Sequence, residues 1–324
     1  MIAFVFPGQG SQQVGMGRAL YDAFPYVRAL YQQADDVLGY ALSRLCFEGP
    51  DDELTRTQWT QPALLLTSVA AAEVLARELG LRPALAAGHS LGEYSALVTA
   101  GSLRFDQAVR LVHLRGRYMQ EAVPEGLGAM AAVVGLPDAK IAEICAAAST
   151  TEERVQPANE NGAGQIVLSG HRPAVERAAA QAKAAGSKLV KLLPVSAPFH
   201  SALMAPAADR LAIELASAEI QAPGLTVVAN IDAEPYPAPS GDAAADSAAV
   251  RTRLVQQVAG TVRWERCAQR LAALGATTAI EVGHGRVLSG MLKRIVPAVT
   301  LFSFGQPADL DALRPLSAPP AGTP

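Results

Sequence analysis

The chain has 324 residues, of which 50% are hydrophobic and 18% charged, and its net charge at pH 7 is −3. This composition is typical of a globular enzyme with a substantial core, and it lacks the basic excess that nucleic-acid binding needs. The N-terminal apolar run is too short for a signal peptide, and no stretch reaches the roughly 18 apolar residues of a membrane span. The three cysteines are scattered without a CxxC pair, so neither a disulfide framework nor a zinc site is expected. We therefore expect a cytoplasmic protein with no metal and with no membrane or nucleic-acid partner.

The first third of the chain alternates apolar runs with helical patterns. Ile2–Phe6 is a short apolar run closed by Pro7 and Gly8, which is typical of a buried parallel strand. Pro83–Gly88 predicts the next core strand, and Leu91–Gly101 predicts a helix that ends at glycine. Helices are expected in between at 14–24, 25–38 and 61–79. Strands that alternate with helices in this way predict an α/β fold with a parallel sheet.

The middle of the chain follows a different order of elements. Strands are expected at 128–136, 154–159, 165–170 and 188–195, and helices at 137–149 and 172–186. The resulting order β-α-β-β-α-β is the ferredoxin-like arrangement. We therefore expect a small ferredoxin-like subdomain at 127–196, inserted into a larger α/β domain.

The α/β pattern resumes after this insert. Helices are expected at 202–217, 249–258, 264–274 and 287–296, and strands at 226–230, 277–283 and 300–304. The Pro-, Ala- and Ser-rich stretch 233–249 predicts a loop. The large catalytic domain is thus expected at 1–126 and 197–304, and the Pro- and Ala-rich segment 305–324 is expected to be a flexible tail.

A Gly-His-Ser-Leu-Gly sequence joins the strand that ends at Gly88 to the helix after Leu91. In this context G-x-S-x-G predicts a nucleophile elbow, which lifts the Ser90 hydroxyl to the end of the sheet. The elbow predicts an α/β-hydrolase-like core with Ser90 as the covalent nucleophile. The Leu91 N–H would lie at a helix N-terminus, where it favours an oxyanion. The alternative is that Ser90 only caps the helix.

The loop after the first strand offers a second oxyanion donor. "FPGQGSQ" (6–12) contains glycines that let the backbone approach a ligand closely. In α/β hydrolases such an early loop supplies the second donor, and Gln9 is the candidate here. An ordinary turn is the alternative for this stretch.

A serine nucleophile needs a base, and the chain has five histidines. Three of them are less suitable as the base. His89 is adjacent to Ser90, His113 lies within a predicted helix, and His171 lies on the insert. His200 lies in a proline-broken loop where the chain returns to the large domain, and His284 follows a late core strand. The residue pattern favours His200 and leaves His284 open. No acidic residue lies at an obvious spacing from either, so a Ser–His dyad oriented by a carbonyl is plausible.

The predicted helix 105–123 carries a candidate for substrate recognition. Its apolar residues recur on one face at a period of 3.6, and Arg115 lies at the edge of that face. A half-buried arginine suits a carboxylate or phosphate, which it can bind with two hydrogen bonds. A structural ion pair with a carboxylate of the protein is the alternative.

Several motifs together resemble malonyl-CoA:acyl carrier protein transacylases, and also the acyltransferase domains of polyketide synthases. They occur in the order "FPGQGSQ" (6–12), "TQPA" (60–63), "GHSLGEYSAL" (88–97), "RGRYMQEAV" (115–123), "NGAGQIVLSG" (161–170) and "PVSAPFHS" (194–201). The resemblance runs from about residue 1 to 304 and includes the small subdomain. It implies malonyl-CoA and holo acyl carrier protein as substrates and partners, no cofactor, a role in fatty-acid synthesis and a monomeric chain.

The resemblance also implies the roles of individual residues. Ser90 would carry the malonyl ester, and His200 would be the general base and then the acid. Gln9 and Leu91 would form the oxyanion hole, and Arg115 would bind the malonyl carboxylate.

For the remaining positions the resemblance implies supporting roles. Gln257, or less favourably Gln256, would lie where a backbone carbonyl holds the histidine. Phe199 would exclude branched acyl groups. Lys188 and Arg286 would lie near the coenzyme A phosphates. His284 stands where the family usually has proline, and the sequence assigns it no role.

Two other functions use part of the same evidence. A serine esterase or thioesterase would use the same elbow and let water attack the ester. A non-catalytic module that only docks a carrier protein would need neither Ser90 nor His200 nor Arg115. Within the transferase interpretation, the chain could also act in trans on a polyketide synthase.

Overall fold

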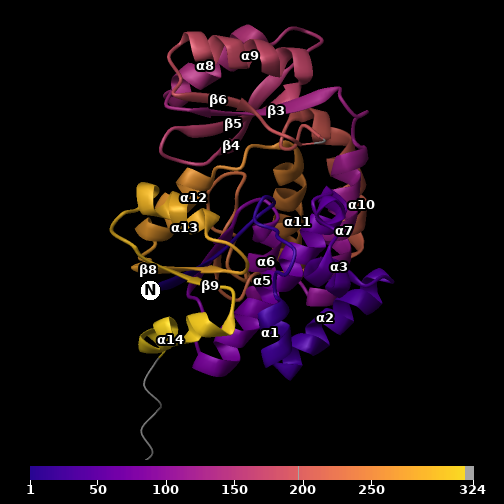
Figure 1. Ribbon diagram of the computed structural model, residues 1–324, viewed down its shortest axis with the longest axis vertical. Helices are drawn as coiled ribbons and strands as arrows, with labels where there is room; N and C mark the ends of the chain where they lie inside the picture. Colours follow the sequence, from indigo (N-terminus) through magenta and orange to yellow (C-terminus); the bar gives the residue numbers. More distant parts are fainter. Residues whose placement is uncertain (196, 318–324) are drawn as a thin grey trace, which may run out of the picture.

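The computed structural model describes residues 1–195 and 197–317, and its larger part is built on a parallel sheet (Figure 1). The strands lie in the order β7-β2-β1-β8-β9, and every neighbouring pair is parallel. They are β1 (Ile2–Phe6), β2 (Leu85–Gly88), β7 (Thr226–Val228), β8 (Thr278–Val282) and β9 (Thr300–Phe304). The predicted α/β fold with a parallel sheet is confirmed.

Helices cover both faces of this sheet. Their bounds are α1 (Arg18–Ala23), α2 (Pro25–Leu38), α3 (Leu42–Glu48), α4 (Asp51–Leu54), α5 (Thr57–Leu79), α6 (Gly92–Thr99), α7 (Phe105–Glu121), α10 (Ala205–Ser217), α11 (Ala243–Ala259), α12 (Trp264–Ala273) and α13 (Val287–Ile295). Phe4 and Phe6 of β1 belong to one hydrophobic cluster, with α5, α6 and α7. Ala3 and Val5 belong to a second cluster, with α12 and α13. Successive side chains of a strand point to opposite faces, so β1 supplies both cores.

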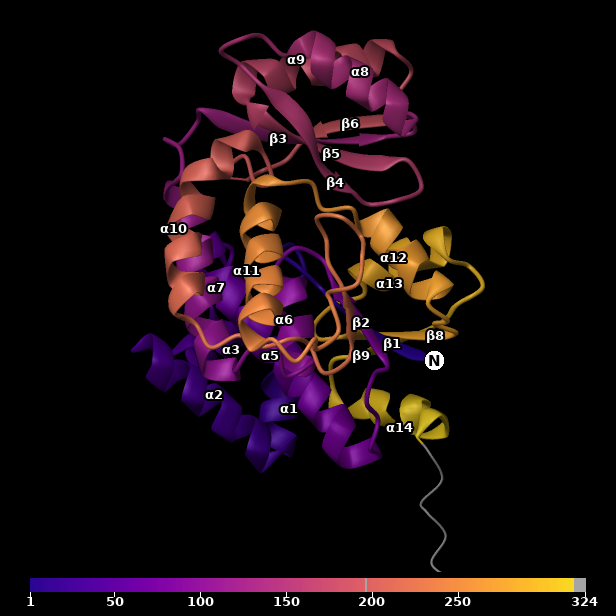
Figure 2. The same ribbon diagram turned by 180° about the vertical axis from the view of Figure 1, so that it is seen from behind.

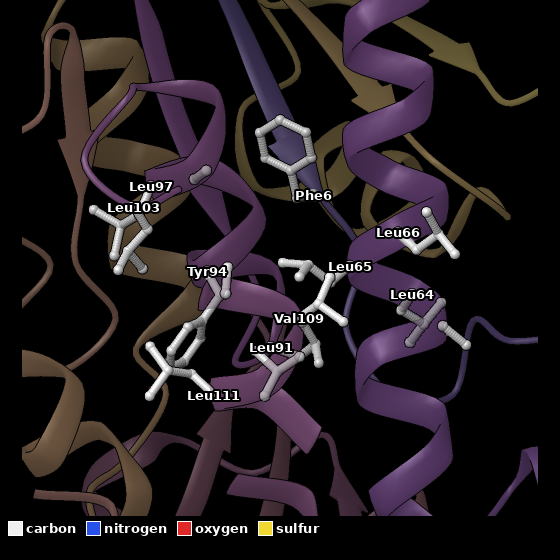
Figure 3. Packing of buried hydrophobic residues seen from close by; sticks show 14 of the residues in the cluster. Phe6, Leu64, Leu65, Leu66, Leu91, Tyr94, Leu97, Leu103, Val109 and Leu111 are labelled. Atoms are coloured by element: carbon white, nitrogen blue, oxygen red, sulfur yellow. The ribbon is translucent and has the colours of Figure 1, made fainter. Parts of the chain in front are cut away.

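The larger cluster holds in place the elements that carry the site. Figure 3 shows Phe6, Leu65, Tyr94 and Val109, which come from β1, α5, α6 and α7. All four are fully buried. Burying a large apolar side chain contributes about 1.5–3 kcal/mol relative to leaving it exposed. This packing therefore fixes the strand–turn–helix unit of β2 and α6 against α7.

The insert forms a second, antiparallel sheet, with strand order β4-β5-β3-β6. Its elements are β3 (Gly128–Val134), α8 (Asp138–Ala148), β4 (Val155–Glu160), β5 (Gln165–His171), α9 (Arg172–Ala184) and β6 (Leu189–Leu192). The two helices cover the outer face of this sheet, and the other face looks toward the larger part (Figure 2). Met130 and Val167 on that inner face belong to the hydrophobic cluster of the larger part. The order is that of a ferredoxin-like unit, while the limits at 127 and 196 stay predictions.

Helix α11 corrects the prediction of a loop at 233–249. It begins at Ala243, six residues before the predicted start, and its N-cap is Asp242. The Asp242 carboxylate accepts hydrogen bonds from the backbone N–H groups of Ala244 and Ala245. This N-cap satisfies amides that a helix end otherwise leaves free. The prolines before Asp242 favour a loop, but the alanine-rich stretch after this N-cap is helical.

The described part of the predicted flexible tail is folded. After β9 the chain forms short helices at Pro307–Asp309, Leu310–Leu313 (α14) and Arg314–Leu316. Leu310 and Leu313 are buried in the larger hydrophobic cluster, which explains why this segment is held. The prediction of a tail starting at 305 is therefore wrong up to residue 317, and 318–324 lie outside the described residues. Within the described ranges, no helix is long and apolar enough to cross a membrane.

Candidate active site

Ser90 lies on a strained turn between β2 and α6. Its φ is +52°, in the left-handed region that a serine rarely adopts. A Cβ added at Gly88 would lie 1.8 Å from the Gly92 carbonyl carbon, and one added at Gly92 would lie 2.1 Å from the Phe6 oxygen. The turn is therefore possible only with glycine on both sides of the serine. This is the geometry of a nucleophile elbow.

The Ser90 hydroxyl is hydrogen-bonded to a histidine rather than to the helix. Ser90 Oγ lies 2.7 Å from His200 Nε2, and His200 Nδ1 lies 2.9 Å from the Gln257 main-chain oxygen. Since a carbonyl can only accept, Nδ1 carries the proton and Nε2 is free to accept from Ser90. The structure thus brings His200, the favoured histidine, to Ser90. A helix-capping serine would instead accept a hydrogen bond from a backbone N–H of α6, and α6 has no such side-chain cap.

His200 is buried beside a cation, and both circumstances keep it neutral. Its side chain is buried and faces Arg115. Burial, with a smaller contribution from the Arg115 charge, lowers the pKa of His200 from 6.5 to about 3. A neutral imidazole is the form that can take a proton from serine at neutral pH.

The two other histidines near the site make different contacts. His89 Nε2 lies 2.9 Å from Asn161 Oδ1, and burial lowers its pKa. His284 Nε2 lies 3.3 Å from Gln13 Oε1. The alternative that His284 is the base is not favoured by these contacts.

Arg115 is fully buried, at 1% exposure, and not half-buried as the sequence pattern indicated. Its Nη1 donates to Gln61 Oε1 at 2.8 Å, and its Nη2 donates to Gln257 Oε1 at 2.9 Å and to Ser90 Oγ at 3.1 Å. Nε has no partner, and no carboxylate lies within ion-pair distance, in the part of the chain that the structure describes. A buried guanidinium without a carboxylate is unfavourable, and its burial lowers its pKa. The role of Arg115 in binding a substrate carboxylate stays a prediction.

A network of three buried polar side chains supports the serine and the arginine; they are Gln257, Asn230 and Glu93. Gln257 Nε2 donates to the Ser90 main-chain oxygen at 2.9 Å and to Glu93 Oε2 at 2.7 Å. Asn230 Oδ1 accepts from the Ser90 main-chain N–H at 2.7 Å, and its Nδ2 donates to Gly88 O at 2.7 Å. Sequence reasoning missed Asn230 and Glu93. The available signals were that Glu93 lies within the GHSLGEY motif and that Asn230 ends a predicted core strand.

A cavity of about 220 Å³ opens in front of Ser90. Gln9 and Leu91 both line it, and the Gln9 side chain donates to Thr57 Oγ1 at 3.2 Å. Phe199 also lines it and is 8% exposed. The small subdomain contributes Asn161 among other residues, so the site lies between the two sheets. The oxyanion and selectivity roles of these residues stay predictions.

Lys188 and Arg286 are both exposed, and neither lines this cavity. Lys188 lies at the start of β6 on the small subdomain, where its N–H donates to Val134 O. Arg286 comes directly before Val287 and Leu288, which do line the cavity. Their contact with coenzyme A phosphates stays a prediction. Among the described residues no group of three or more His, Cys, Asp or Glu side chains could hold a metal ion.

A serine hydrogen-bonded to a neutral histidine at the end of a parallel sheet is typical of enzymes that work through an acyl-serine ester. The acyl transferase domain family matches residues 3–297. A malonyl CoA-acyl carrier protein transacylase of Salmonella typhimurium is 49% identical over 310 residues, which cover 96% of this chain and 97% of that protein. The chain belongs to the family of malonyl CoA-acyl carrier protein transacylases.

Solved structures agree with this assignment. An acyl carrier protein S-malonyltransferase from Vibrio cholerae superposes with a TM-score of 0.90 at 46% identity, covering 96% of this chain and 99% of the other. A malonyl-transacylase solved in complex with a type II polyketide synthase acyl-carrier protein gives a TM-score of 0.91 at 45% identity. The match covers 97% of this chain and 98% of that one. The predicted fold and family are confirmed.

The elbow geometry predicts that two glycine substitutions differ sharply in their effect on the free energy of unfolding. Gly92→Ala should destabilise the protein by at least about 1–3 kcal/mol, because the new methyl group would overlap the Phe6 carbonyl. Gly290→Ala is the matched control, since it lies in α13 with nothing within 4 Å of the added carbon. It should be neutral or stabilise by up to about 1 kcal/mol. Urea unfolding of both variants measures the difference, and equal stabilities would contradict the described turn.

Proposed function

We propose that this chain transfers a malonyl group from malonyl-CoA to the phosphopantetheine thiol of acyl carrier protein, through a malonyl ester on Ser90. The observation that carries the proposal is the convergence of three side chains. Ser90 Oγ lies 2.7 Å from His200 Nε2 and 3.1 Å from Arg115 Nη2. The proposed base and the proposed carboxylate-binding residue are thus both hydrogen-bonded to the oxygen of the proposed nucleophile.

The first half-reaction loads the serine. His200 Nε2 takes the Ser90 hydroxyl proton while Oγ attacks the thioester carbonyl, and the negative charge forms on the carbonyl oxygen. The N–H groups of Gln9 and Leu91 stabilise that charge, as preorganised donors do in acyl transfer. The C–S bond then breaks, the proton passes from His200 to the sulfur, and coenzyme A leaves.

The second half-reaction reverses the chemistry with a different thiol. The phosphopantetheine thiol gives its proton to neutral His200 and attacks the ester carbonyl. The C–O bond to Ser90 breaks, and the proton returns from His200 to Oγ. The Gln257 carbonyl keeps the histidine in the required tautomer throughout, in the place that an aspartate takes in a Ser-His-Asp triad.

Arg115 accounts for selection of an acyl group that ends in a carboxylate. Its guanidinium lies beside the nucleophile, so the acid it binds must be close to the carbonyl under attack. A three-carbon diacid meets that condition. Phe199 lines the same cavity and would restrict branched acyl groups.

Two further points belong to the same proposal. The carrier protein is supported by the solved complex of a relative with a polyketide synthase acyl-carrier protein. We place the chain in fatty-acid synthesis as a cytoplasmic monomer, while action in trans on a polyketide synthase is the second candidate. The three cysteines are all free, as expected in a reducing compartment.

The nucleophile and the transfer step are tested together by intact-protein mass after brief mixing with malonyl-CoA. The wild type should gain one malonyl group, and holo acyl carrier protein should then remove it and carry the same mass. Ser90→Ala should gain nothing, because it lacks the attacking hydroxyl. A wild-type protein without adduct that releases free malonate would instead support a hydrolase.

Arg115→Ala should lose malonyl transfer and keep or gain acetyl transfer. Losing a buried partner of a charge costs about 2–5 kcal/mol, and each 1.4 kcal/mol is a factor of ten. Arg117→Ala is the control, because Arg117 lies on the same helix, pairs with Glu121 and does not line the cavity. Transfer rates with malonyl-CoA and acetyl-CoA measure the effect. Equal losses on both acyl groups would contradict the carboxylate role.

A further inference from the structure

Glu93 is a fully buried carboxylate that the proposed mechanism does not use. It lies one turn after Ser90, in the first turn of α6. Its Oε2 accepts from the Asn230 main-chain N–H at 3.0 Å and from Gln257 Nε2 at 2.7 Å, and its Oε1 accepts from the Tyr236 hydroxyl. All three partners are hydrogen-bond donors, so both carboxylate oxygens have partners.

Gln257 connects Glu93 to all three proposed functional residues. Its main-chain oxygen accepts from His200 Nδ1 at 2.9 Å, and its Oε1 accepts from Arg115 Nη2 at 2.9 Å. Its Nε2 donates to the Ser90 oxygen at 2.9 Å as well as to Glu93. Its side chain and its main chain thus each contact a part of the site.

The carboxamide of Gln257 works in only one of its two orientations. With Oε1 toward Arg115, the guanidinium finds an acceptor and the amide N–H groups find acceptors on Glu93 and Ser90. After a flip, the amide N–H groups would face the N–H groups of Arg115, and Oε1 would face two acceptors. Both arrangements of like groups are unfavourable, so the acceptor at Glu93 selects the working orientation.

We propose that Glu93 is a positioning residue, which fixes the Gln257 side chain and thereby places Arg115 beside Ser90. This inference rests on the proposed function of Arg115 and Ser90. Glu93 itself does not reach the substrate cavity, since it is absent from the cavity lining. Its proposed effect on Arg115 passes through Gln257.

This role requires an acceptor oxygen and does not require a charge. Burial raises the pKa of Glu93 to about 7, while its hydrogen bonds and the nearby Arg115 charge oppose the rise. A protonated carboxyl group still accepts through one oxygen, and the Tyr236 hydroxyl can accept as well as donate. A glutamine at 93 can therefore keep Oε1 toward Gln257 and turn its amide N–H groups toward Tyr236. A shorter aspartate keeps the charge and loses the reach.

Two substitutions of Glu93 separate the need for an acceptor oxygen within reach of Gln257 from the need for a negative charge. Glu93→Gln should acylate at a rate close to that of the wild type when mixed with saturating malonyl-CoA. Glu93→Asp should be slower by about 10²-fold, which is the typical cost of misplacing a catalytic group by about 1 Å. Tyr236→Phe is the control, because it removes a contact to Glu93 and leaves the contact with Gln257 intact. Thermal unfolding of each variant shows that the comparison is made on folded protein.

A double-mutant cycle with Gln257→Ala tests whether Glu93 acts through Gln257. Residues that act as one unit are not additive, so Glu93→Asp should cause no further loss once Gln257 is alanine. The same 10²-fold loss in both backgrounds would overturn the proposal in favour of a purely structural role. A slow Glu93→Gln with a fast Glu93→Asp would overturn it in favour of charge balance with Arg115. A wild type that forms no malonyl ester would overturn the proposed function itself, which is a distinguishable result.

Discussion

The left-handed backbone of Ser90 is the constraint on which the site depends. Such a conformation costs a non-glycine residue about 1–3 kcal/mol, and it persists only where the surroundings enforce it. Here the enforcement comes from the contact of Gly92 with Phe6 and from the hydrogen bond of the Ser90 N–H to Asn230. Both partners belong to the parallel sheet or lie at its carboxyl end. The sheet therefore carries the strain that presents the hydroxyl to His200.

Burial gives the site its chemistry. Arg115, Glu93 and His200 are all withdrawn from water, and each has a pKa shifted by that burial. The histidine is kept neutral, which suits it to act as a base, and the guanidinium of Arg115 is hydrogen-bonded to the neutral side chains of Gln61, Gln257 and Ser90. The small subdomain completes the enclosure with residues of its inner face. In the proposed mechanism this enclosure would shield the acyl ester until the second thiol arrives.

The sequence was sufficient where local pattern and local function coincide. The core strands, the elbow around Ser90 and the ferredoxin-like order all follow from periodicity and glycine positions within short windows. The residue pattern already favoured His200 over His284, and the fold adds the contact of 2.7 Å between His200 Nε2 and Ser90 Oγ. The pattern predicts Arg115 at the edge of an apolar face, whereas the side chain is fully buried and contacts Gln61 of α5 and Gln257 of α11.

What the sequence did not reveal depends on contacts between distant segments. Glu93 and Asn230 are 137 residues apart in the chain and meet only because β2 and β7 are neighbours in the sheet. The folding of the segment after 304 depends on a hydrophobic cluster that is built mostly from the N-terminal third. The start of α11 was missed for a different reason, since Asp242 is a recognisable N-cap signal that the surrounding prolines outweighed.

The most direct test of the account is the titration of His200 itself. Histidine labelled with ¹³C at Cε1 can be followed by NMR across pH, with the His200 signal assigned by its loss in His200→Ala. A base kept neutral by burial and by Arg115 should show no midpoint near its ordinary pKa of 6.5, because the pKa is lowered to about 3. A midpoint near 6.5 would show that the histidine is hydrated and charged over much of the range, and it would contradict the buried Ser90–His200 pair.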